Sequence, residues 1–256
     1  MSAKNNQPDI PLRQGRGDDI PALGLGTWRL DGEECVRTVR QALEMGYSHV
    51  DTAEMYGNEA EVGRGMDDAS VDRDSVFLTT KVFRDHLAAD SLKAAAEESL
   101  KKLGTDYVDL LLIHWPNERV PLQETLGAMQ ELQEAGEVRN IGVSNFTVGL
   151  MQEAEEVAES PIFCNQVEYH PFLSQEPVLR WCREHGLLLT AYSPLARGKV
   201  LDEPVLERIG ETHGKTPAQV ALRWMMQQEG VVAIPKASSE DHLRQNLAIT
   251  DFELSE

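Results

Sequence analysis

Eight short apolar runs, each followed by a longer amphipathic stretch, constrain this chain more than any other feature of its sequence. Their continuous apolar character predicts strands that are buried on both faces, as parallel sheets require. The runs occupy residues 22–26, 48–52, 76–81, 107–114, 138–144, 162–168, 187–193 and 231–235. The amphipathic stretches predict helices at residues 33–45, 59–69, 90–103, 121–135, 147–158, 176–185, 204–228 (broken) and 239–246.

Eight strand–helix units in 256 residues predict an α/β fold, a TIM (β/α)8 barrel, with residues 1–256 forming a single domain. The main alternative is a doubly wound open sheet, which normally carries a GxGxxG turn after its first strand. Here the first strand instead leads into GLGTW, at residues 24–28. Residues 10–20 have the pattern of a small β-hairpin, which we expect to plug the N-terminal face of the barrel.

Several predicted helices carry the usual signals at their ends. Asp90 precedes an Ala-rich and Glu-rich helix, and Thr216-Pro217 places a proline at a first helical position. Glycines stand where a left-handed residue commonly ends a helix. They are Gly46, Gly104, Gly136 and Gly186. Each is followed within a few residues by the next predicted strand, as short barrel connections require.

The chain is strongly acidic, with 43 Asp and Glu residues, 24 Lys and Arg residues and a formal net charge of −19. This balance argues against a nucleic-acid partner, which needs a basic face, and against anionic membranes. Two interpretations of the acidity stay open. One is an ordinary acidic bacterial-type enzyme, and the other is adaptation to high salt, where a Debye length of about 3 Å at 1 M mutes self-repulsion. Only 8 of the basic residues are lysine, which favours the second.

Targeting and redox signals point to the cytoplasm. Cys35, Cys164 and Cys182 are odd in number and show no CxxC spacing, which indicates free thiols in a reducing compartment and no zinc site. The N-terminus is polar, without the apolar core of a signal peptide. No apolar run approaches the roughly 18 residues that a membrane helix needs.

Four side chains lie at or just after the ends of three predicted strands. Asp51 and Tyr56 follow the second strand, Lys81 ends the third and His114 ends the fourth. The carboxyl ends of barrel strands meet at one mouth, where TIM-barrel enzymes carry their active sites. A tyrosine, a lysine, a carboxylate and a histidine gathered there suit proton transfer to a carbonyl oxygen.

Each of the four has its own chemical reason to be there. A tyrosine hydroxyl has a pKa of about 10, so we expect the Lys81 ammonium to lower the pKa of Tyr56 toward the working range. Lys81 is costly to bury unless a carboxylate such as Asp51 pairs with it. His114 can donate a hydrogen bond that orients the substrate oxygen. Taken singly, these residues could equally be a helix cap, a solvated strand edge or a core histidine.

The segments DTAEMYGNE, TTK and LLIHW occur in the order and context of the aldo-keto reductase family, which the chain resembles over nearly its whole length. The resemblance implies reversible NAD(P)H-dependent reduction of aldehydes or ketones, with hydride from the nicotinamide and a proton from Tyr56. It also implies a small-molecule carbonyl substrate and a monomer. The likeness is to the small prokaryotic branch described as 2,5-diketo-D-gluconate or methylglyoxal reductases.

The resemblance assigns further residues to the nicotinamide half of the cofactor. The matched positions are Gly26 and Thr27 after the first strand, Ser144, Asn145 and Gln166 for the carboxamide, Tyr192 for ring stacking, and Ser193, Leu195 and Gly198 for the loop over the pyrophosphate. Arg197 or Lys199 would add charge to that loop. The alternative interpretations are helix capping for Ser144 and Asn145, and a surface turn for the loop.

The adenosine half is matched less completely. The family positions are occupied here by Lys236, Ala237, Ser238, His242, Gln245 and Asn246. Ala237, His242 and Gln245 stand where the family usually has Ser, Arg and Glu, while Ser238 and Ser239 offer hydroxyl donors at a helix start. Losing the arginine removes a bidentate phosphate clamp. We therefore expect NADPH as the preferred cofactor and NADH as an alternative.

The same matching assigns Trp28, Met55, Phe83 and Trp115 to the substrate pocket, although any of them could instead be packing at the barrel mouth. The sequence ends at DFELSE, without the further helix and tail that family members usually carry, so we expect a more open pocket. Two rival functions stay open. One is a nicotinamide-binding redox sensor with slow turnover, and the other is a metal-dependent barrel hydrolase that uses His114, Asp51 and Glu54.

Overall fold

Eight parallel strands close into a barrel in the computed structural model, which describes residues 10–255. The strands are hydrogen-bonded in chain order, and a parallel bridge between Leu23 and Ala233 joins the two ends of the sheet. They are β3 (Leu25–Gly26), β4 (His49–Asp51), β5 (Phe77–Val82), β6 (Val108–Ile113), β7 (Val138–Ser144), β8 (Ile162–Glu168), β9 (Leu188–Tyr192) and β10 (Val231–Ala233). The predicted TIM barrel is confirmed.

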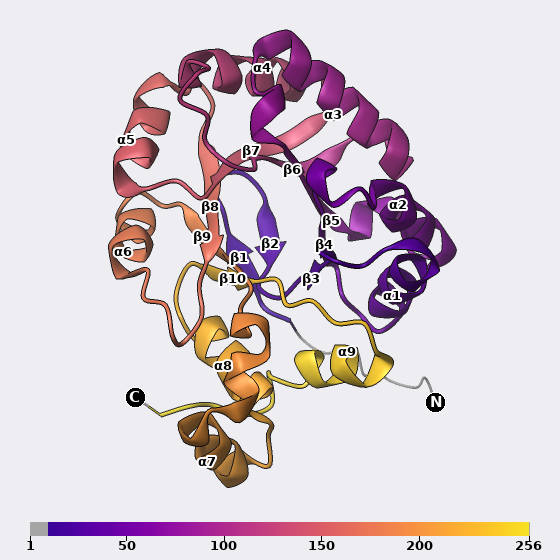
Figure 1. The fold of residues 1–256 in the computed structure, drawn as a ribbon, viewed down its shortest axis with the longest axis vertical. Helices are drawn as coiled ribbons and strands as arrows, with labels where there is room; N and C mark the ends of the chain where they lie inside the picture. The colour runs from indigo at the N-terminus through magenta and orange to yellow at the C-terminus, as the bar shows by residue number, and fades with distance from the viewer. Residues whose placement is uncertain (1–9, 256) are drawn as a thin grey trace.

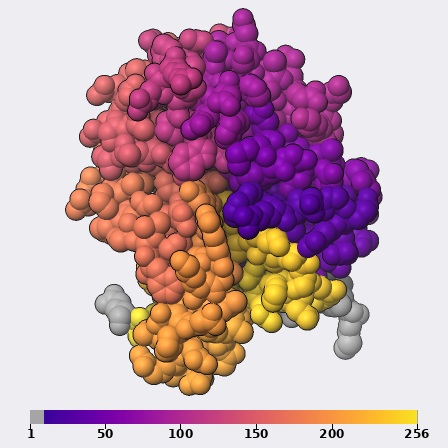
Figure 2. All heavy atoms as spheres, in the orientation of Figure 1, coloured from indigo at the N-terminus to yellow at the C-terminus, as the bar shows by residue number. Residues whose placement is uncertain are grey.

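Helices form a ring outside the strands, with α7 lying beyond α8 at the edge of the molecule (Figure 1). They are α1 (Gly32–Glu44), α2 (Glu59–Asp68), α3 (Ala89–Leu103), α4 (Leu122–Glu134), α5 (Val148–Val157), α6 (Glu176–Glu184), α7 (Pro204–His213), α8 (Pro217–Met226) and α9 (Glu240–Leu247). Four short 3-10 turns stand in the connections: η1 (Glu54–Tyr56), η2 (Arg73–Ser75), η3 (Arg84–His86) and η4 (Ala196–Asp202). The yellow C-terminal segment lies against the indigo N-terminal one where α9 contacts α1 (Figure 2).

Helix boundaries follow the sequence signals closely, and an informative difference occurs at the start of α3. The break predicted within residues 204–228 falls at Gly214, whose φ of 65° ends α7, and Thr216 then caps α8 in a reciprocal capping box with Gln219. The α3 helix begins at Ala89, one residue before Asp90, so Asp90 lies in the first turn and does not cap the helix. An acidic residue there still interacts favourably with the helix dipole.

The predicted N-terminal hairpin is present, as β1 (Leu12–Gln14) paired with β2 (Asp19–Pro21). Its Ile20 is fully buried and packs in one cluster with Phe77, Phe163 and Val232 of the barrel strands. The hairpin comes so close that a Cβ added at Gly15 would meet the Phe163 ring at 2.1 Å. Since Phe77 and Phe163 stand at the beginnings of their strands, the hairpin closes the N-terminal end and leaves the other end open.

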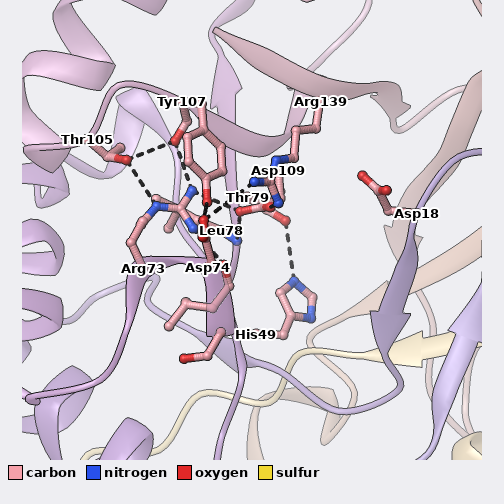
Figure 3. A network of polar contacts seen from close by, with 12 residues as sticks. Asp18, His49, Arg73, Asp74, Leu78, Thr79, Thr105, Tyr107, Asp109 and Arg139 are labelled. Carbon is pink, nitrogen blue, oxygen red and sulfur yellow. Dashed lines mark hydrogen bonds and ion pairs between the residues drawn. The ribbon is translucent and has the colours of Figure 1, made fainter. Parts of the chain in front are cut away.

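A polar network ties the strands together near that closed end (Figure 3). The Asp109 carboxylate accepts hydrogen bonds from Arg73 at 2.8 Å, from Arg139 at 3.0 Å and from the Leu78 backbone N–H at 2.9 Å. Both guanidinium groups lie over the Tyr107 ring, about 4 Å from its centroid. The network thus joins η2, β5, β6 and β7 through one carboxylate.

The three cysteines are buried and unpaired. Among the described residues no helix is both long and apolar enough to cross a membrane.

Candidate active site

The four candidate catalytic side chains converge at the open, C-terminal end of the barrel. Asp51 is the last residue of β4, Lys81 is the last but one of β5, and His114 follows β6 directly. Tyr56 is held by η1, the single turn that follows β4. These four residues are separated in the sequence but lie together, because neighbouring parallel strands end at the same rim of the barrel.

A buried ion pair forms the base of this cluster. The Lys81 Nζ lies 2.6 Å from Asp51 Oδ1 and donates to the Thr52 carbonyl at 2.7 Å and to the Tyr56 hydroxyl at 3.3 Å. The Lys81 side chain is 0% exposed, so it is not a solvated strand edge. Burial lowers the pKa of Lys81, but the Asp51 carboxylate and the Tyr56 hydroxyl outweigh burial and raise that pKa above its ordinary value. Lys81 is therefore a charged ammonium at neutral pH.

The expected net lowering of the Tyr56 pKa does not occur in this structure. Burial raises the pKa of Tyr56 above its ordinary value, Lys81 lowers it in part, and the Asp51 carboxylate opposes Lys81. The ammonium thus acts in the predicted direction, but removing the hydroxyl from water has the larger effect. Tyr56 consequently keeps its proton at neutral pH and can donate it.

His114 is neutral. Burial and the nearby Lys81 charge lower the pKa of His114 to about 3. Its ring lies edge-on to Tyr56 and to Phe83, with centroids 5.7 and 6.1 Å away, and its buried Nδ1 has no hydrogen-bond partner within residues 10–255. A neutral imidazole can hydrogen-bond a carbonyl oxygen but holds no surplus proton, so Tyr56 is the better acid of the two.

A cavity of about 210 Å³ opens above the cluster. Predicted residues from all three groups line it: Gly26, Thr27, Trp28, Asp51, Met55, Tyr56, His114, Trp115, Ser144, Asn145, Gln166, Tyr192, Ser193 and Lys236. Met55 and Trp115 are 47% and 42% exposed, so much of the apolar wall faces solvent. The catalytic, cofactor and substrate positions thus share one chamber.

The remaining predicted positions do not line this cavity. Phe83 packs on His114 from the side, and Leu195 packs partly into the core. Gly198 lies in η4 with a φ of 93°. Ser238 precedes α9, His242 and Gln245 are exposed on that helix, and Asn246 is buried beside the Tyr47 hydroxyl. Only Ser239 caps α9, by accepting the His242 backbone N–H at 3.3 Å.

The carboxamide positions are linked to the ion pair by hydrogen bonds. Gln166 Nε2 donates to Asp51 Oδ2 at 2.7 Å, and Ser144 Oγ donates to the Gln166 carbonyl at 2.8 Å. Asn145, with a φ of 63°, donates to Ser144 Oγ and to the His114 carbonyl and accepts from the Tyr192 hydroxyl at 2.9 Å. Ser144 and Asn145 do not cap α5, because Thr147 does.

The segment that follows β9 bends sharply beside the cavity. Ser193, Ala196 and Arg197 all have φ near +50°, a conformation that costs non-glycine residues roughly 1 kcal/mol or more each. Arg197 lines the cavity and lies 5.6 Å from the centroid of the Trp28 ring, which Arg29 covers at 4.3 Å. With Lys236, Arg197 makes the cavity wall basic in a strongly acidic protein.

Sequence reasoning missed Asn58, which is buried and cross-links two loops of the site. Its side chain donates to the Thr27 and Leu30 carbonyls at 2.9 and 2.8 Å and accepts from the Thr52 hydroxyl at 2.8 Å. Asn58 thereby joins the loop that carries Trp28 to the loop that carries Tyr56. A polar residue between Gly57 and a helix start was the only signal in the sequence, and it is common to many turns.

The metal-hydrolase alternative finds no support in the geometry. Over residues 10–255 no group of three or more His, Cys, Asp or Glu side chains is arranged to hold a metal ion. Lys81, which would have to bridge metals in such an enzyme, is instead paired with Asp51.

Comparison with known proteins identifies the family over nearly the whole chain. Residues 22–256 match the model of the aldo/keto reductase family. Methylglyoxal reductase DkgB of Escherichia coli O157:H7 is 43% identical over 238 residues, which cover 92% of this chain and 89% of that protein.

Solved structures agree with this match. A crystal structure provisionally assigned as 2,5-diketo-D-gluconic acid reductase B has a TM-score of 0.95 and 49% identity, covering 97% of this chain and 89% of that one. An aldo-keto reductase of Bombyx mori, solved in complex with NADP, has a TM-score of 0.89 and 34% identity, covering 96% and 89%. A closed barrel, a Tyr–Lys–Asp–His cluster at its open end and these likenesses together lead to one conclusion: the chain belongs to the aldo/keto reductase family and is an oxidoreductase that acts on carbonyl groups through a nicotinamide cofactor.

Proposed function

We propose that this enzyme reduces small α-oxoaldehydes and related carbonyl compounds with NADPH, as a cytoplasmic monomer. The observation that carries the proposal is the proton-bearing Tyr56 hydroxyl, hydrogen-bonded to the buried Lys81–Asp51 pair at the edge of the cavity. The cavity of about 210 Å³ has to accommodate a nicotinamide ring as well as the substrate, which favours a short carbon chain. The buried free thiols suit a reducing compartment.

In this proposal Tyr56 supplies the proton to the substrate oxygen, and Lys81 stabilises the phenolate that remains. Asp51 keeps Lys81 charged in the dry base of the site, since an unpaired buried ammonium would tend to lose its proton. Neutral His114 orients the carbonyl by a hydrogen bond. A nicotinamide cofactor held in this cavity would supply the hydride.

The residues present fit such a cofactor. The flat face of Tyr192 and the polar groups of Ser144, Asn145 and Gln166 line the same chamber as the proton donor. Arg197 and Lys236 place two positive charges on its wall, and the start of α9 lies just beyond Lys236. Anionic phosphates suit that charge and that helix start, although Glu240 and Asp241 in the first turn weaken the attraction.

The test of this function is a panel of aldehydes, ketoses and α-dicarbonyls, including methylglyoxal, assayed with NADPH and NADH in parallel. We expect the highest kcat/KM for small α-oxoaldehydes with NADPH. Cofactor binding without any aldehyde-dependent oxidation of the cofactor would instead support the redox-sensor alternative, which the named reductase relatives do not favour. Elution as a dimer in gel filtration would contradict the monomer.

Cofactor choice has its own test at His242, which stands on the exposed face of α9 where the family usually has an arginine. His242→Arg should restore a bidentate partner for the 2′-phosphate and raise the NADPH-to-NADH affinity ratio by roughly tenfold, while His242→Ala should lower it by a few fold. Dissociation constants measured at constant salt give the ratio. An equal ratio in all three proteins would show that this position does not contact the phosphate.

A further inference from the structure

A carboxylate outside the catalytic cluster connects the segment that carries Tyr56 to the segment that follows Lys81. Glu54 is the first residue of η1, the turn that carries Tyr56. Its Oε2 accepts the Phe83 backbone N–H at 2.9 Å, and its Oε1 lies 2.5 Å from His86 Nδ1. Phe83 and His86 belong to the connection after β5, which begins two residues beyond Lys81.

This connection matters because η1 has little else to hold it. A single 3-10 turn has weak internal hydrogen bonding, and here Ala53 at its start offers no side-chain cap. Within residues 10–255, the other side-chain hydrogen bonds at the turn are the Tyr56 hydroxyl on Lys81, at the long distance of 3.3 Å, and the Asn58 cross-link after it, while the Tyr56 ring also contacts Lys81 and His114. The Glu54 side chain is 18% exposed, and its hydrogen bond from the Phe83 N–H is partly buried, whereas the His86 partner is 49% exposed.

The two segments that Glu54 joins also enclose His114. Tyr56 from η1 and Phe83 from the connection after β5 both lie edge-on to its ring, at 5.7 and 6.1 Å. A shift of either segment would change where the Tyr56 hydroxyl and the imidazole point relative to each other. Proton transfer and carbonyl orientation both depend on that relative placement.

We propose that Glu54, with His86 as its partner, is a positioning residue for the reaction: it holds η1 against the Phe83–His86 segment and so sets the placement of Tyr56 relative to Lys81 and His114. Neither residue lines the cavity, so neither touches substrate or cofactor. The inference rests on the proposed carbonyl reduction, because Tyr56 positioning has a kinetic consequence only if Tyr56 is the proton donor.

The experiment compares Glu54→Ala, Glu54→Gln, His86→Ala and the double variant Glu54→Ala/His86→Ala with wild type, using methylglyoxal and saturating NADPH well below the melting temperature. Glu54→Ala removes both hydrogen bonds and should lower kcat by roughly tenfold, since small misplacements of reacting groups have effects of that order or more. Glu54→Gln keeps an acceptor for the Phe83 N–H and should recover most of the rate. The dissociation constant of NADPH should stay within about twofold in all variants, since Glu54 lies outside the cavity.

The double variant tests whether the two residues act together. If His86 works only through Glu54, the double variant should match Glu54→Ala instead of showing the product of the two single losses. Glu131→Ala is the matched control, because Glu131 forms an ion pair with Lys93 between α3 and α4, away from the cavity. It should change neither kcat nor KM.

The outcomes separate the two proposals. An inactive wild type would overturn the proposed function and this inference together. An active wild type with Glu54→Ala at wild-type kcat would overturn this inference alone. A loss in Glu54→Ala that is equal in kcat and in cofactor affinity, with no recovery in Glu54→Gln, would indicate general damage to the fold and would also overturn it.

Discussion

Two carboxylates, Asp51 and Asp109, organise ion pairs near opposite ends of the same barrel, and the contrast shows what distinguishes a reactive network from a supporting one. The Asp109 carboxylate accepts hydrogen bonds from two arginines and a backbone N–H. Arg73 also donates to the Val76 and Tyr107 carbonyls and to the Thr105 hydroxyl. A guanidinium stays protonated at any pH that the protein meets. The groups that bind the Asp109 carboxylate can therefore neither donate nor accept a proton near neutral pH.

The network around Asp51 is more deeply buried, with Lys81 and Asp51 at 0% and 1% exposure against 22% and 43% for Arg73 and Arg139, and it ends differently. All three Lys81 donors are occupied, yet one of their acceptors is the Tyr56 hydroxyl, which faces the cavity and carries a transferable proton. Beside it, the buried Nδ1 of His114 has no hydrogen-bond partner among residues 10–255. Burial and ion pairing are common to both ends of the barrel, so these properties alone do not identify an active site. The titratable Tyr56 hydroxyl that faces the cavity does.

The largest expected effect tests the reactive end. Tyr56→Phe removes the proposed acid and leaves the ring in place, so kcat should fall by at least about a hundredfold, the usual range for a general acid. NADPH affinity, measured by fluorescence titration, should be nearly unchanged. If the variant keeps more than about a tenth of wild-type kcat, Tyr56 is not the acid.

The next effect tests the Asp109 network near the closed end of the barrel. Asp109→Asn leaves Arg73 without a carboxylate partner and Arg139 with only the exposed Asp74, 3.6 Å away. We expect the free energy of unfolding to fall by about 2–3 kcal/mol, allowing for the 43% exposure of Arg139. For a chain of this size that corresponds to a melting temperature lower by roughly 5–10 °C. The kcat at 25 °C should stay within about twofold of wild type. A selective loss of kcat would instead place Asp109 in the catalytic apparatus.

A third effect concerns pH and His49, which lies inside the barrel two residues before Asp51. Burial and the Lys81 charge lower the pKa of His49 to about 3, against about 6.5 in an unfolded chain. Below pH 6.5 the unfolded state therefore takes up a proton that the folded state refuses, and stability falls as the pH falls toward 3.

Chemical denaturation at pH 7, 6 and 5 measures how the free energy of unfolding changes with pH. We expect His49 to lower the free energy of unfolding by about 2 kcal/mol at pH 5. His49→Phe keeps a ring against Phe77, whose centroid lies 5.5 Å from that of His49 in the native protein. The substitution should reduce the number of protons taken up on unfolding at pH 5 by nearly one. An unchanged slope would mean that the acid sensitivity resides in other groups, His114 first among them.

The smallest effect is the salt dependence of the melting temperature, which tests the surface charges independently of the two ion-pair networks. Self-repulsion among 19 net negative charges is screened in molar salt, whereas the Asp51 and Asp109 carboxylates, 1% and 6% exposed, are screened much less. If the acidity reflects adaptation to high salt, the melting temperature should rise between low salt and 2 M KCl by a similar amount in wild type and in Asp109→Asn. A flat or falling melting temperature would favour an ordinary acidic enzyme.

The barrel and the reactive end were both predictable from local patterns. Runs such as VFLTTK and YVDLLLIH carry their strand signal in a few residues, and Gly104 and Thr216-Pro217 mark helix ends by local backbone preferences. The first strand was harder: residues 22–26 were expected, but only Leu25–Gly26 form regular pairs, because Leu23 bridges to β10 at the closure of the barrel. Asp51, Lys81 and His114 could be grouped because each closes a strand whose end lies at a known face.

These features were predictable because they depend on residues close together along the chain and on the rule that parallel strands end at one rim. The remaining features depend on contacts between residues far apart in the sequence. Asp109 sits inside an apolar run, and nothing nearby in the sequence foretells that Arg73 and Arg139 meet it. The Glu54 contact with His86 spans 32 residues, and the pKa of Tyr56 depends on how completely the surrounding loops exclude water. Desolvation and long-range hydrogen bonds are properties of the packed molecule, because they depend on which distant groups meet and on how much water they displace.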